Sequence, residues 1–353
     1  MPRKSSREKT ADARSEKPVP DRNSKGRAEG QARGQADGVR QEVRLVTISE
    51  DNDGQRVDNF LLAQLRGVPK SIIYRIVRKG EVRVNKGRVK PDTRLKVGDR
   101  LRIPPVVRKE KAETIKPGSR VQSVMEDSVI FENDQMLVVN KPSGIAVHGG
   151  SGLSFGLIEV LRAARPEAHF LELVHRLDRD TSGLVMIAKK RSALRYLQDE
   201  LRERRIGKHY HALVGGNWSD SISKVDVPLL RYEMANGERR VKVDEAGKPS
   251  LTRFRCLAHY EGYSLVEASP VTGRTHQIRV HSVWAGHPIA GDDKYMDDVS
   301  LKAFRTLGGQ RLMLHAYALE FALPVTGEPI HLRAPYDHAF SDVLKKLEAR
   351  LTR

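Results

Sequence analysis

Apolar residues recur at helical spacing in the first folded part of the sequence. Two sets of four, separated by a break at residues 68–70, predict two short helices in succession. Their members are Val57, Phe60, Leu61 and Leu65, then Ile72, Ile73, Ile76 and Val77. From Gly80 to Pro104 apolar and basic residues alternate instead, which is typical of strands with one solvent-facing side. Residues 54–105 therefore predict a small domain in which strands follow a helix pair.

A longer, mixed pattern occupies residues 125–350. Alternation and short apolar runs predict strands at residues 128–131, 135–140, 209–216, 250–260, 263–271 and 312–324. Helical spacing predicts helices through residues 157–164 and 194–201, and one that opens at Thr275 with Ile278 and Val283 toward the core. Because strands are many and alternating strand–helix units few, we expect an α+β domain with one mixed, mostly antiparallel sheet flanked by helices.

The remaining segments lack a pattern that could form a core. Residues 1–44 have no aromatic residue, few large apolar ones and many charges, so we expect a disordered basic tail. Residues 106–124 are charged and contain proline, as expected of an interdomain linker. No segment resembles a signal peptide or a membrane span, and Cys256, the single cysteine, cannot form an internal disulfide. We therefore expect a cytoplasmic protein without membrane contact.

The charge of the chain is positive and unevenly distributed. Lys and Arg number 63 against 45 Asp and Glu, which gives a net charge of +18. Residues 54–109 alone hold sixteen basic and four acidic residues, a net charge of +12. These cations are interleaved with an apolar pattern that predicts a fold, rather than collected in one solvated run. Such a module favours a nucleic-acid partner.

The nine residues HRLDRDTSG, at positions 175–183, are the most distinctive motif of the larger domain. Apolar runs before and after it predict two buried strands, which places Asp178 where a strand gives way to a loop. A carboxylate there, between Arg176 and Arg179, is partly desolvated yet compensated in charge, as is typical of a catalytic carboxylate. The residues alone leave another interpretation open, a turn aspartate that binds backbone amides.

The complete motif resembles the signature of the pseudouridine synthases that modify large-subunit ribosomal RNA, in which HRLD is followed two residues later by TSG. The segments KHYHALV at 208–214 and GRTHQIRVH at 273–281 agree with the same family, and the basic module resembles the S4 RNA-binding domain. This resemblance covers the chain from about Gly54 to the C-terminus. It implies an isomerase of 23S ribosomal RNA that needs no metal or redox cofactor. We expect a monomer with no obligate protein partner.

The resemblance assigns the chemistry to three side chains. Asp178 is the nucleophile when the N1–C1′ bond of uridine breaks and C5 is joined to C1′, and whether it attacks the base or the sugar stays open. Tyr210 shares one face of a predicted strand with Lys208, so its ring can stack on the uracil and its hydroxyl can transfer a proton. Arg279 is expected to pair with Asp178, with Arg274 as the alternative.

Other residues are expected to hold the RNA. By the resemblance, Arg176 fills the gap that a uridine leaves when it swings out of the RNA, and an ordinary phosphate contact is the alternative. His148, in a glycine-rich loop, is expected to line the RNA groove. In the S4-like module, the cations expected to contact phosphates are Lys70, Arg75, Arg78, Lys79, Arg83 and Lys86.

Two other functions are compatible with parts of the sequence. A non-catalytic RNA-binding factor would use the basic module and keep the larger domain as a scaffold, but the joint presence of Asp178, Tyr210 and Arg279 argues against it. The pair His209 and His211 suggests a metal-dependent hydrolase, but the strand pattern turns both away from Tyr210, and neither HExxH nor a Cys/His cluster occurs in the sequence. No metal site is therefore expected.

Overall fold

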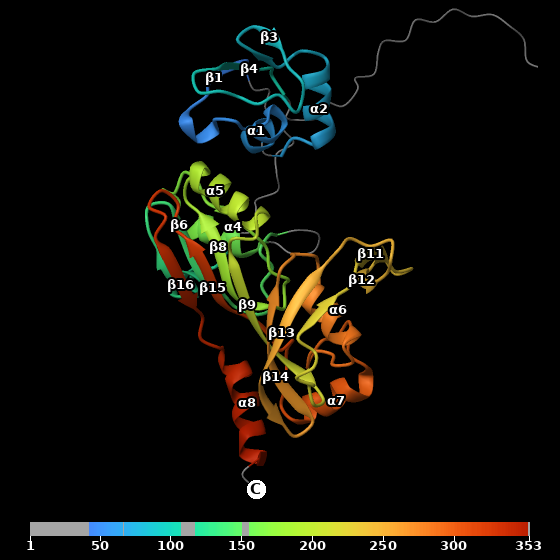
Figure 1. Cartoon of the computed structure of the whole chain (residues 1–353). Coiled ribbons are helices and arrows are strands. Elements are labelled where there is room, and N and C mark those ends of the chain that lie inside the picture. Colours follow the sequence, from blue (N-terminus) through green and yellow to red (C-terminus); the bar gives the residue numbers. More distant parts are fainter. Residues whose placement is uncertain (1–41, 66, 107–116, 150–154, 352–353) are drawn as a thin grey trace, which may run out of the picture.

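The computed structural model describes residues 42–351, apart from residues 66, 107–116 and 150–154. Figure 1 shows a small N-terminal unit, coloured blue, beside a larger domain that contains the rest of the chain. For residues 1–41, the predicted disorder of the tail lies outside the described residues.

The small unit consists of the helix pair and the strands that the sequence predicts. Its elements are β1 Arg44–Thr47, the 3-10 helix η1 Glu50–Asn52, α1 Val57–Gln64, α2 Lys70–Arg78, β2 Arg83–Val84, β3 Gly87–Arg88 and β4 Arg100–Ile103. The strands form an antiparallel sheet in the order β1-β4-β2-β3, and the apolar sides of both helices contribute to one core. Phe60 and Ile73 are at most 1% exposed, and burial of a side chain of this size contributes about 1.5–3 kcal/mol to stability.

The N-terminal boundary of this unit differs from the predicted one. Strand β1 pairs with β4 from Arg44 to Thr47, so the unit begins at the end of the predicted tail and well before Gly54. Backbone hydrogen bonds hold this short strand, and none of its four side chains is fully buried, so its apolar pattern is weak. The unit approaches the larger domain at helix α5, Arg191–Arg202, where Arg195 Nη2 lies 3.7 Å from Asp53 Oδ2.

The predicted linker, residues 106–124, runs into a helix. Helix α3, Ser119–Asp127, packs against α4, Leu157–Ala164, and Met125 of α3 is fully buried there. The larger domain therefore begins by Ser119 rather than at residue 125. Because Met125 is the one fully buried residue of α3, the helix has too little apolar pattern to be recognised among its charged neighbours.

A ten-stranded mixed sheet forms the centre of the larger domain. Its order is β10-β13-β14-β9-β15-β8-β6-β5, with β7 paired to β8 and β16 paired to β15. The strands are β5 Val129–Glu132, β6 Met136–Lys141, β7 Glu172–Leu173, β8 Ser182–Ala188, β9 Gly207–Gly215, β10 Lys224–Asp226, β13 Leu251–Tyr260, β14 Tyr263–Pro270, β15 Leu314–Ala322 and β16 Pro329–Arg333. Strands β15 and β8 are parallel, and the other pairs are antiparallel. The expected α+β fold is confirmed.

Helices cover both faces of this sheet around β6 and β8. Met136 and Val138 of β6 pack with residues of α5, whereas Leu137 and Val139 pack with residues of α3 and α4. Alternate residues of a strand point to opposite faces, so both faces of β6 are covered. Strand β8 is buried at all seven of its positions, which explains its uninterrupted apolar run after Gly183.

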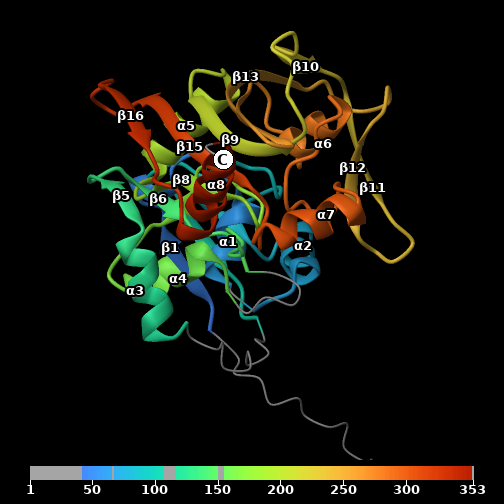
Figure 2. The same cartoon turned by 90° about the horizontal axis from the view of Figure 1, so that it is seen from below.

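Three helices and a hairpin surround the other half of the sheet. The helices are α6 Gln277–Trp284, α7 Asp298–Thr306 and α8 His338–Leu351, and the hairpin strands are β11 Leu229–Glu233 and β12 Arg239–Val243. Phe304 of α7 and Phe340 of α8 are fully buried in one core cluster with strands β9 and β14. The hairpin extends from the domain beside α6, where Leu229, Val241 and Val280 pack together (Figure 1, Figure 2). Among the described helices, none combines the length and the apolar character that crossing a bilayer requires.

Helix α6 begins later than the sequence predicts. The pattern places its opening at Thr275, but His276 has a left-handed backbone with φ of 53°, so the helix starts at Gln277. Ile278 is buried as predicted, whereas Val283 is 38% exposed, so its predicted place in the core is wrong.

Candidate active site

The HRLD motif forms the loop between β7 and β8. Leu177 is buried in an apolar cluster with Val185 and Ala316, which anchors the loop next to Asp178. At the end of the motif Gly183 has φ of 108°, and a Cβ added there would lie 2.3 Å from the carbonyl oxygen of Ala316. Only glycine therefore allows β8 to lie this close to β15.

The backbone after Asp178 is held by the last residue of β6 and the loop that follows it. Lys141 Nζ donates a hydrogen bond to the carbonyl of Arg179 at 2.9 Å, and Ser143 Oγ donates to that of Asp180 at 2.7 Å. Lys141 is fully buried, and its desolvation lowers its pKa to about 7 although nearby carboxylates oppose this shift. The sequence does not reveal this lysine, because it precedes a proline in a segment without periodicity.

A cavity of about 640 Å³ lies at this loop. Asp178, Tyr210 and Arg279 all line it, so the structure brings together the three side chains to which the resemblance assigns the chemistry. Of the described residues that line the cavity, Asp178 is the one carboxylate, and the cations are Arg176, Arg202, Arg204, Lys208, Arg274 and Arg279. The Asp178 side chain is 21% exposed, so it is partly desolvated yet accessible from the cavity.

Arg279 approaches Asp178, but its closer partner is another carboxylate. Its Nη1 lies 3.9 Å from Asp178 Oδ2, whereas Asp292, which is fully buried, accepts hydrogen bonds from Nε at 2.7 Å and from Nη2 at 2.5 Å. The predicted contact between Arg279 and Asp178 is present but long, and the sequence does not reveal Asp292, which holds the guanidinium. Burial lowers the pKa of Arg279, but the bonds to Asp292 outweigh it and leave the pKa above its usual value. The alternative, Arg274, donates to the carbonyl of Pro249.

Tyr210 lies in β9, between β14 and β15. The predicted alternation of side chains along β9 is confirmed, because Lys208 lines the same cavity as Tyr210. The two histidines lie on the opposite face, where His209 contacts Ser269 and His211 stacks on Tyr317. Burial raises the pKa of Tyr210 well above its usual value, and the charge of Asp178 adds to this shift. The phenol is therefore protonated near neutral pH and available as a proton donor.

A histidine also lies near Asp178, and the sequence does not reveal this proximity. His276 Nε2 lies 3.8 Å from Asp178 Oδ2, and His276 Nδ1 lies 2.7 Å from the hydroxyl of Tyr295. Desolvation lowers the pKa of His276, although the charge of Asp178 opposes this shift, so the ring is neutral near neutral pH.

The arginines that flank Asp178 in the sequence have different surroundings. Arg176 is exposed and lines the cavity, and among the described residues it has no ion-pair partner. Arg179 pairs with Asp180, its Nε lying 3.0 Å from Oδ1, so it does not compensate Asp178 as the sequence suggests. His148 is exposed, lies 3.8 Å from Glu159 and does not line the cavity, so its place in an RNA groove stays a prediction.

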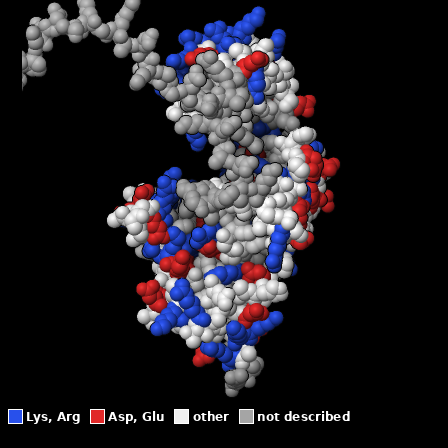
Figure 3. Space-filling view, turned by 180° about the vertical axis from the view of Figure 1, so that it is seen from behind, with Lys and Arg blue, Asp and Glu red and all other residues white. Residues whose placement is uncertain are grey.

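The six cations expected to bind phosphates are all exposed on the N-terminal unit. Figure 3 shows Lys and Arg side chains gathered over this unit, at the top of the view. Within the described ranges, none of the six forms an ion pair with a carboxylate, and Arg78 and Arg83 donate to backbone carbonyls. Their positive charge is therefore available to a polyanion.

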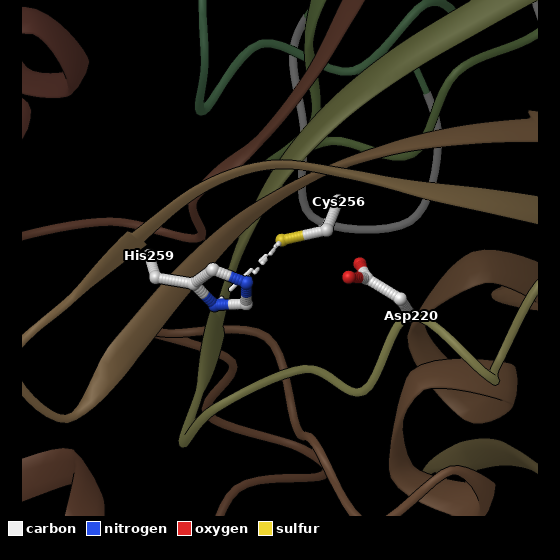
Figure 4. Close-up of side chains that lie close together, drawn as sticks. All are labelled: Asp220, Cys256 and His259. Carbon is white, nitrogen blue, oxygen red and sulfur yellow. Dashed lines mark hydrogen bonds between the residues drawn. The ribbon is translucent and has the colours of Figure 1, made fainter.

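One group of metal-ligating side chains comes together in the part of the chain that the structure describes. Figure 4 shows Asp220, Cys256 and His259, whose ligand atoms lie within 4.8 Å of one another. A β-bulge between Cys256 and Ala258 brings Cys256 and His259 to one side of β13, which sequence spacing cannot reveal. The sequence contains no such cluster of neighbouring residues, so this grouping arises only in the fold, and none of the three residues lines the cavity of Asp178.

Comparisons with known proteins agree with both units. A family profile described as RNA pseudouridylate synthase matches residues 135–283, and one described as S4 domain matches residues 55–101. The ribosomal large subunit pseudouridine synthase C of Haemophilus influenzae is 56% identical over 310 residues, which cover 88% of this chain and 96% of that protein. The chain belongs to the RNA pseudouridylate synthase family. It is therefore an isomerase of uridines in RNA, as the motifs predict.

A second bacterial relative and a solved human structure agree with this family assignment. The ribosomal large subunit pseudouridine synthase C of Escherichia coli strain K12 is 56% identical over 309 residues, covering 86% of this chain and 97% of that protein. The structure of human RNA pseudouridylate synthase domain containing 4 superposes with a TM-score of 0.54 at 27% identity, over 65% of this chain and 96% of that one. The segments RVDNFL at 56–61 and NKPSG at 140–144 predict the C-type of large-subunit synthase, and both bacterial relatives carry that name.

Proposed function

We propose that this protein converts uridines of large-subunit ribosomal RNA to pseudouridine, with Asp178 as the nucleophile. The observation that carries the proposal is the single carboxylate of the described cavity, which six cationic side chains surround. Cations favour a polyanionic strand, and a partly desolvated carboxylate suits a nucleophile. The names of the bacterial relatives, ribosomal large subunit pseudouridine synthases, indicate the RNA. We expect the protein to act where that subunit is assembled, in the cytoplasm.

The isomerisation is balanced without any added group. The N1–C1′ bond breaks, the uracil turns while it stays bound, and a C5–C1′ bond forms, while the proton lost from C5 is matched by one gained at N1. Asp178 attacks either C1′ of the sugar or the base, and both routes lead to the same product. The reaction requires that water be excluded while the sugar carbon is free, since hydrolysis would otherwise compete.

Tyr210 and Arg279 support this chemistry in different ways. The half-buried Tyr210 ring offers a face on which uracil can stack, and its protonated hydroxyl can pass a proton to the turning base. Arg279, fixed by Asp292, places positive charge 3.9 Å from Asp178 without forming a tight pair with it. The carboxylate is thus compensated and still able to react.

The basic surfaces supply the binding. Arg176, exposed beside Asp178, is placed to fill the gap that an extruded uridine leaves. The exposed cations of the N-terminal unit contact phosphates and position the enzyme on structured RNA without reading its sequence.

The test uses purified protein and an unmodified 23S ribosomal RNA transcript. Pseudouridine is counted by mass spectrometry of nuclease digests, and its positions are mapped by sequencing. We expect product at a small set of uridines, and loss of modification at the same uridines in rRNA from a deletion strain. An intact wild-type protein that binds the transcript but forms no pseudouridine would favour the rival function, a non-catalytic RNA-binding factor.

A further inference from the structure

His276 has a backbone conformation that few residues other than glycine adopt. Its φ of 53° lies in the left-handed region, where residues other than glycine persist only when their surroundings hold them. The side chain is 12% exposed, and its ring lies edge-on to Tyr295 with ring centroids 5.5 Å apart. The fold therefore holds this ring in one place, within reach of Asp178.

Hydrogen bonds determine which ring nitrogen carries the proton. The Tyr295 hydroxyl accepts a hydrogen bond from the backbone N–H of Val241 at 2.9 Å. Among the described residues, the acceptor for the proton of the Tyr295 hydroxyl is His276 Nδ1, at 2.7 Å. Nδ1 is then unprotonated, so the neutral ring carries its proton on Nε2. The opposite tautomer would set the Nε2 lone pair against the Asp178 carboxylate and leave the phenolic proton without an acceptor.

The two groups that approach Asp178 approach the same oxygen. His276 Nε2 lies 3.8 Å and Arg279 Nη1 lies 3.9 Å from Oδ2. Oδ1 is therefore the oxygen that lies farther from these two nitrogens. A nucleophile held in this way presents one defined oxygen to its substrate, which favours a reactive geometry.

Tyr295 is in turn held by the hairpin of β11 and β12. Val241 belongs to β12 and packs with Val280 of α6, and Arg240 Nη1 donates to the carbonyl of Lys294, next to Tyr295, at 2.8 Å. The position of the hairpin therefore determines where the Tyr295 hydroxyl lies. The position of that hydroxyl in turn determines the tautomer of His276.

We propose that His276 is a positioning residue whose Nε2–H faces Asp178 Oδ2 at 3.8 Å, longer than a hydrogen bond, and closes on that oxygen when a uridine binds, so that Oδ1 faces the base, and that Tyr295 sets its tautomer. This inference rests on the proposed role of Asp178. It adds a second contact to Oδ2 beside that of Arg279, and it assigns the β11–β12 hairpin a part in arranging the site.

The test compares two amides of different reach at position 276. Asparagine tolerates the left-handed backbone, but its amide extends only about as far as Nδ1, whereas the amide of glutamine extends about as far as Nε2 and can donate to Asp178. We expect His276→Asn to lower the single-turnover rate of pseudouridine formation roughly a hundredfold with unchanged RNA affinity. His276→Gln should recover most of that loss. Equal losses in the two variants, or no loss in either, would overturn the inference.

A second variant tests the tautomer without touching His276. Tyr295→Phe removes only the hydroxyl, and we expect a single-turnover rate about tenfold lower, again with unchanged RNA affinity. The control is Tyr232→Phe, a half-exposed tyrosine of the same hairpin, which should leave the rate unchanged. Equal rates for Tyr295→Phe and Tyr232→Phe would contradict the inference while wild-type activity upholds the proposed function. Failure of the proposed function would show instead as an inactive wild type.

Discussion

The chemistry proposed here depends on one guanidinium that lies between two shielded carboxylates, those of Asp292 and Asp178. Arg279 makes two short hydrogen bonds to Asp292 and reaches Asp178 only at 3.9 Å. The tight pair fixes the guanidinium in a buried position, and the longer contact leaves the second carboxylate able to move toward a substrate. The reacting residue and the residue that anchors its cation are thus different side chains.

Substitution of the anchoring residue should damage both stability and rate. Asp292→Asn leaves the buried Arg279 cation without its tight partner, so we expect the free energy of unfolding to fall by about 3–5 kcal/mol. Its neighbour Asp293 is 61% exposed and lies 4.0 Å from Arg279, so Asp293→Asn should change that free energy by less than about 0.5 kcal/mol. Urea unfolding of both variants measures the difference, and equal stabilities would show that the Arg279–Asp292 pair is not an anchor.

These residues also show where prediction from the sequence ends. Asp178, Tyr210 and Arg279 lie in three segments with clear motifs, so they could be named before the structure was known. Asp292 and Asp293 are adjacent in the sequence, and nothing in it shows that the first is buried and the second exposed. The position of His276 depends on a left-handed backbone and a tyrosine from another loop, which only the folded chain brings together.

At the scale of elements, the site depends on strand β8 and its close approach to β15. All seven residues of β8 are buried, and Gly183 lets the backbone of Ala316 come into contact. The loop with Asp178 enters this strand directly, so the packing of β8 determines where the carboxylate lies.

A pair of glycine substitutions can isolate this close contact. Gly183→Ala places a methyl group 2.3 Å from a backbone oxygen, so we expect a loss of about 3 kcal/mol or more, and lower activity. Gly262 also has a positive φ, of 74°, but open space around it, so Gly262→Ala should cost only about 1–2 kcal/mol, for the backbone alone. Thermal unfolding compares the two, and an equal loss would mean that the contact with β15 is unimportant.

The elements differ in how visible they are in the sequence. Helices α4 and α5 and strands β9, β13 and β14 have complete apolar patterns and follow the prediction. Strand β1, helix α3 and the β11–β12 hairpin bury too few side chains to leave such a pattern. Helix α8 is a different case, since its buried residues recur at helical spacing and the sequence does carry a signal for it, in Phe340, Val343, Leu344 and Leu347.

At the scale of the whole molecule, two units divide the work between binding and chemistry. The N-terminal unit carries the densest positive charge, and the larger domain carries the cavity. The two approach each other at Asp53 and Arg195, so an RNA held by one unit lies close to the other.

This division predicts a particular salt dependence. Each phosphate contact contributes about 0.9 to the slope of log affinity against log salt concentration on a duplex. Neutralising the six exposed cations of the N-terminal unit with glutamine should therefore make the slope shallower by up to about 5. The control neutralises Lys302, Lys345 and Arg350, exposed cations of α7 and α8, and should leave the slope unchanged. Equal slopes for both sets, measured by filter binding, would exclude the N-terminal unit as the anchor.

Acid should destabilise the whole fold through its buried histidines. Burial lowers the pKa of His281 and of His315 from 6.5 to about 4. Between these values the unfolded chain binds protons that the folded chain does not, so the free energy of unfolding falls as the pH falls, by at most about 1.4 kcal/mol per pH unit for each histidine. His315→Gln should make this dependence shallower, and His331→Gln, an exposed control, should not. An unchanged dependence in His315→Gln would contradict this assignment.

The most direct test of the account compares two neighbouring carboxylates of one loop. Asp178→Asn and Asp180→Asn are assayed in single turnover on the unmodified 23S transcript, with RNA affinity measured in parallel. We expect Asp178→Asn to bind the RNA normally and to form no detectable pseudouridine, while Asp180→Asn, whose residue pairs with Arg179, keeps most of the wild-type rate. Pseudouridine formed by Asp178→Asn at a rate close to that of the wild type would contradict the account.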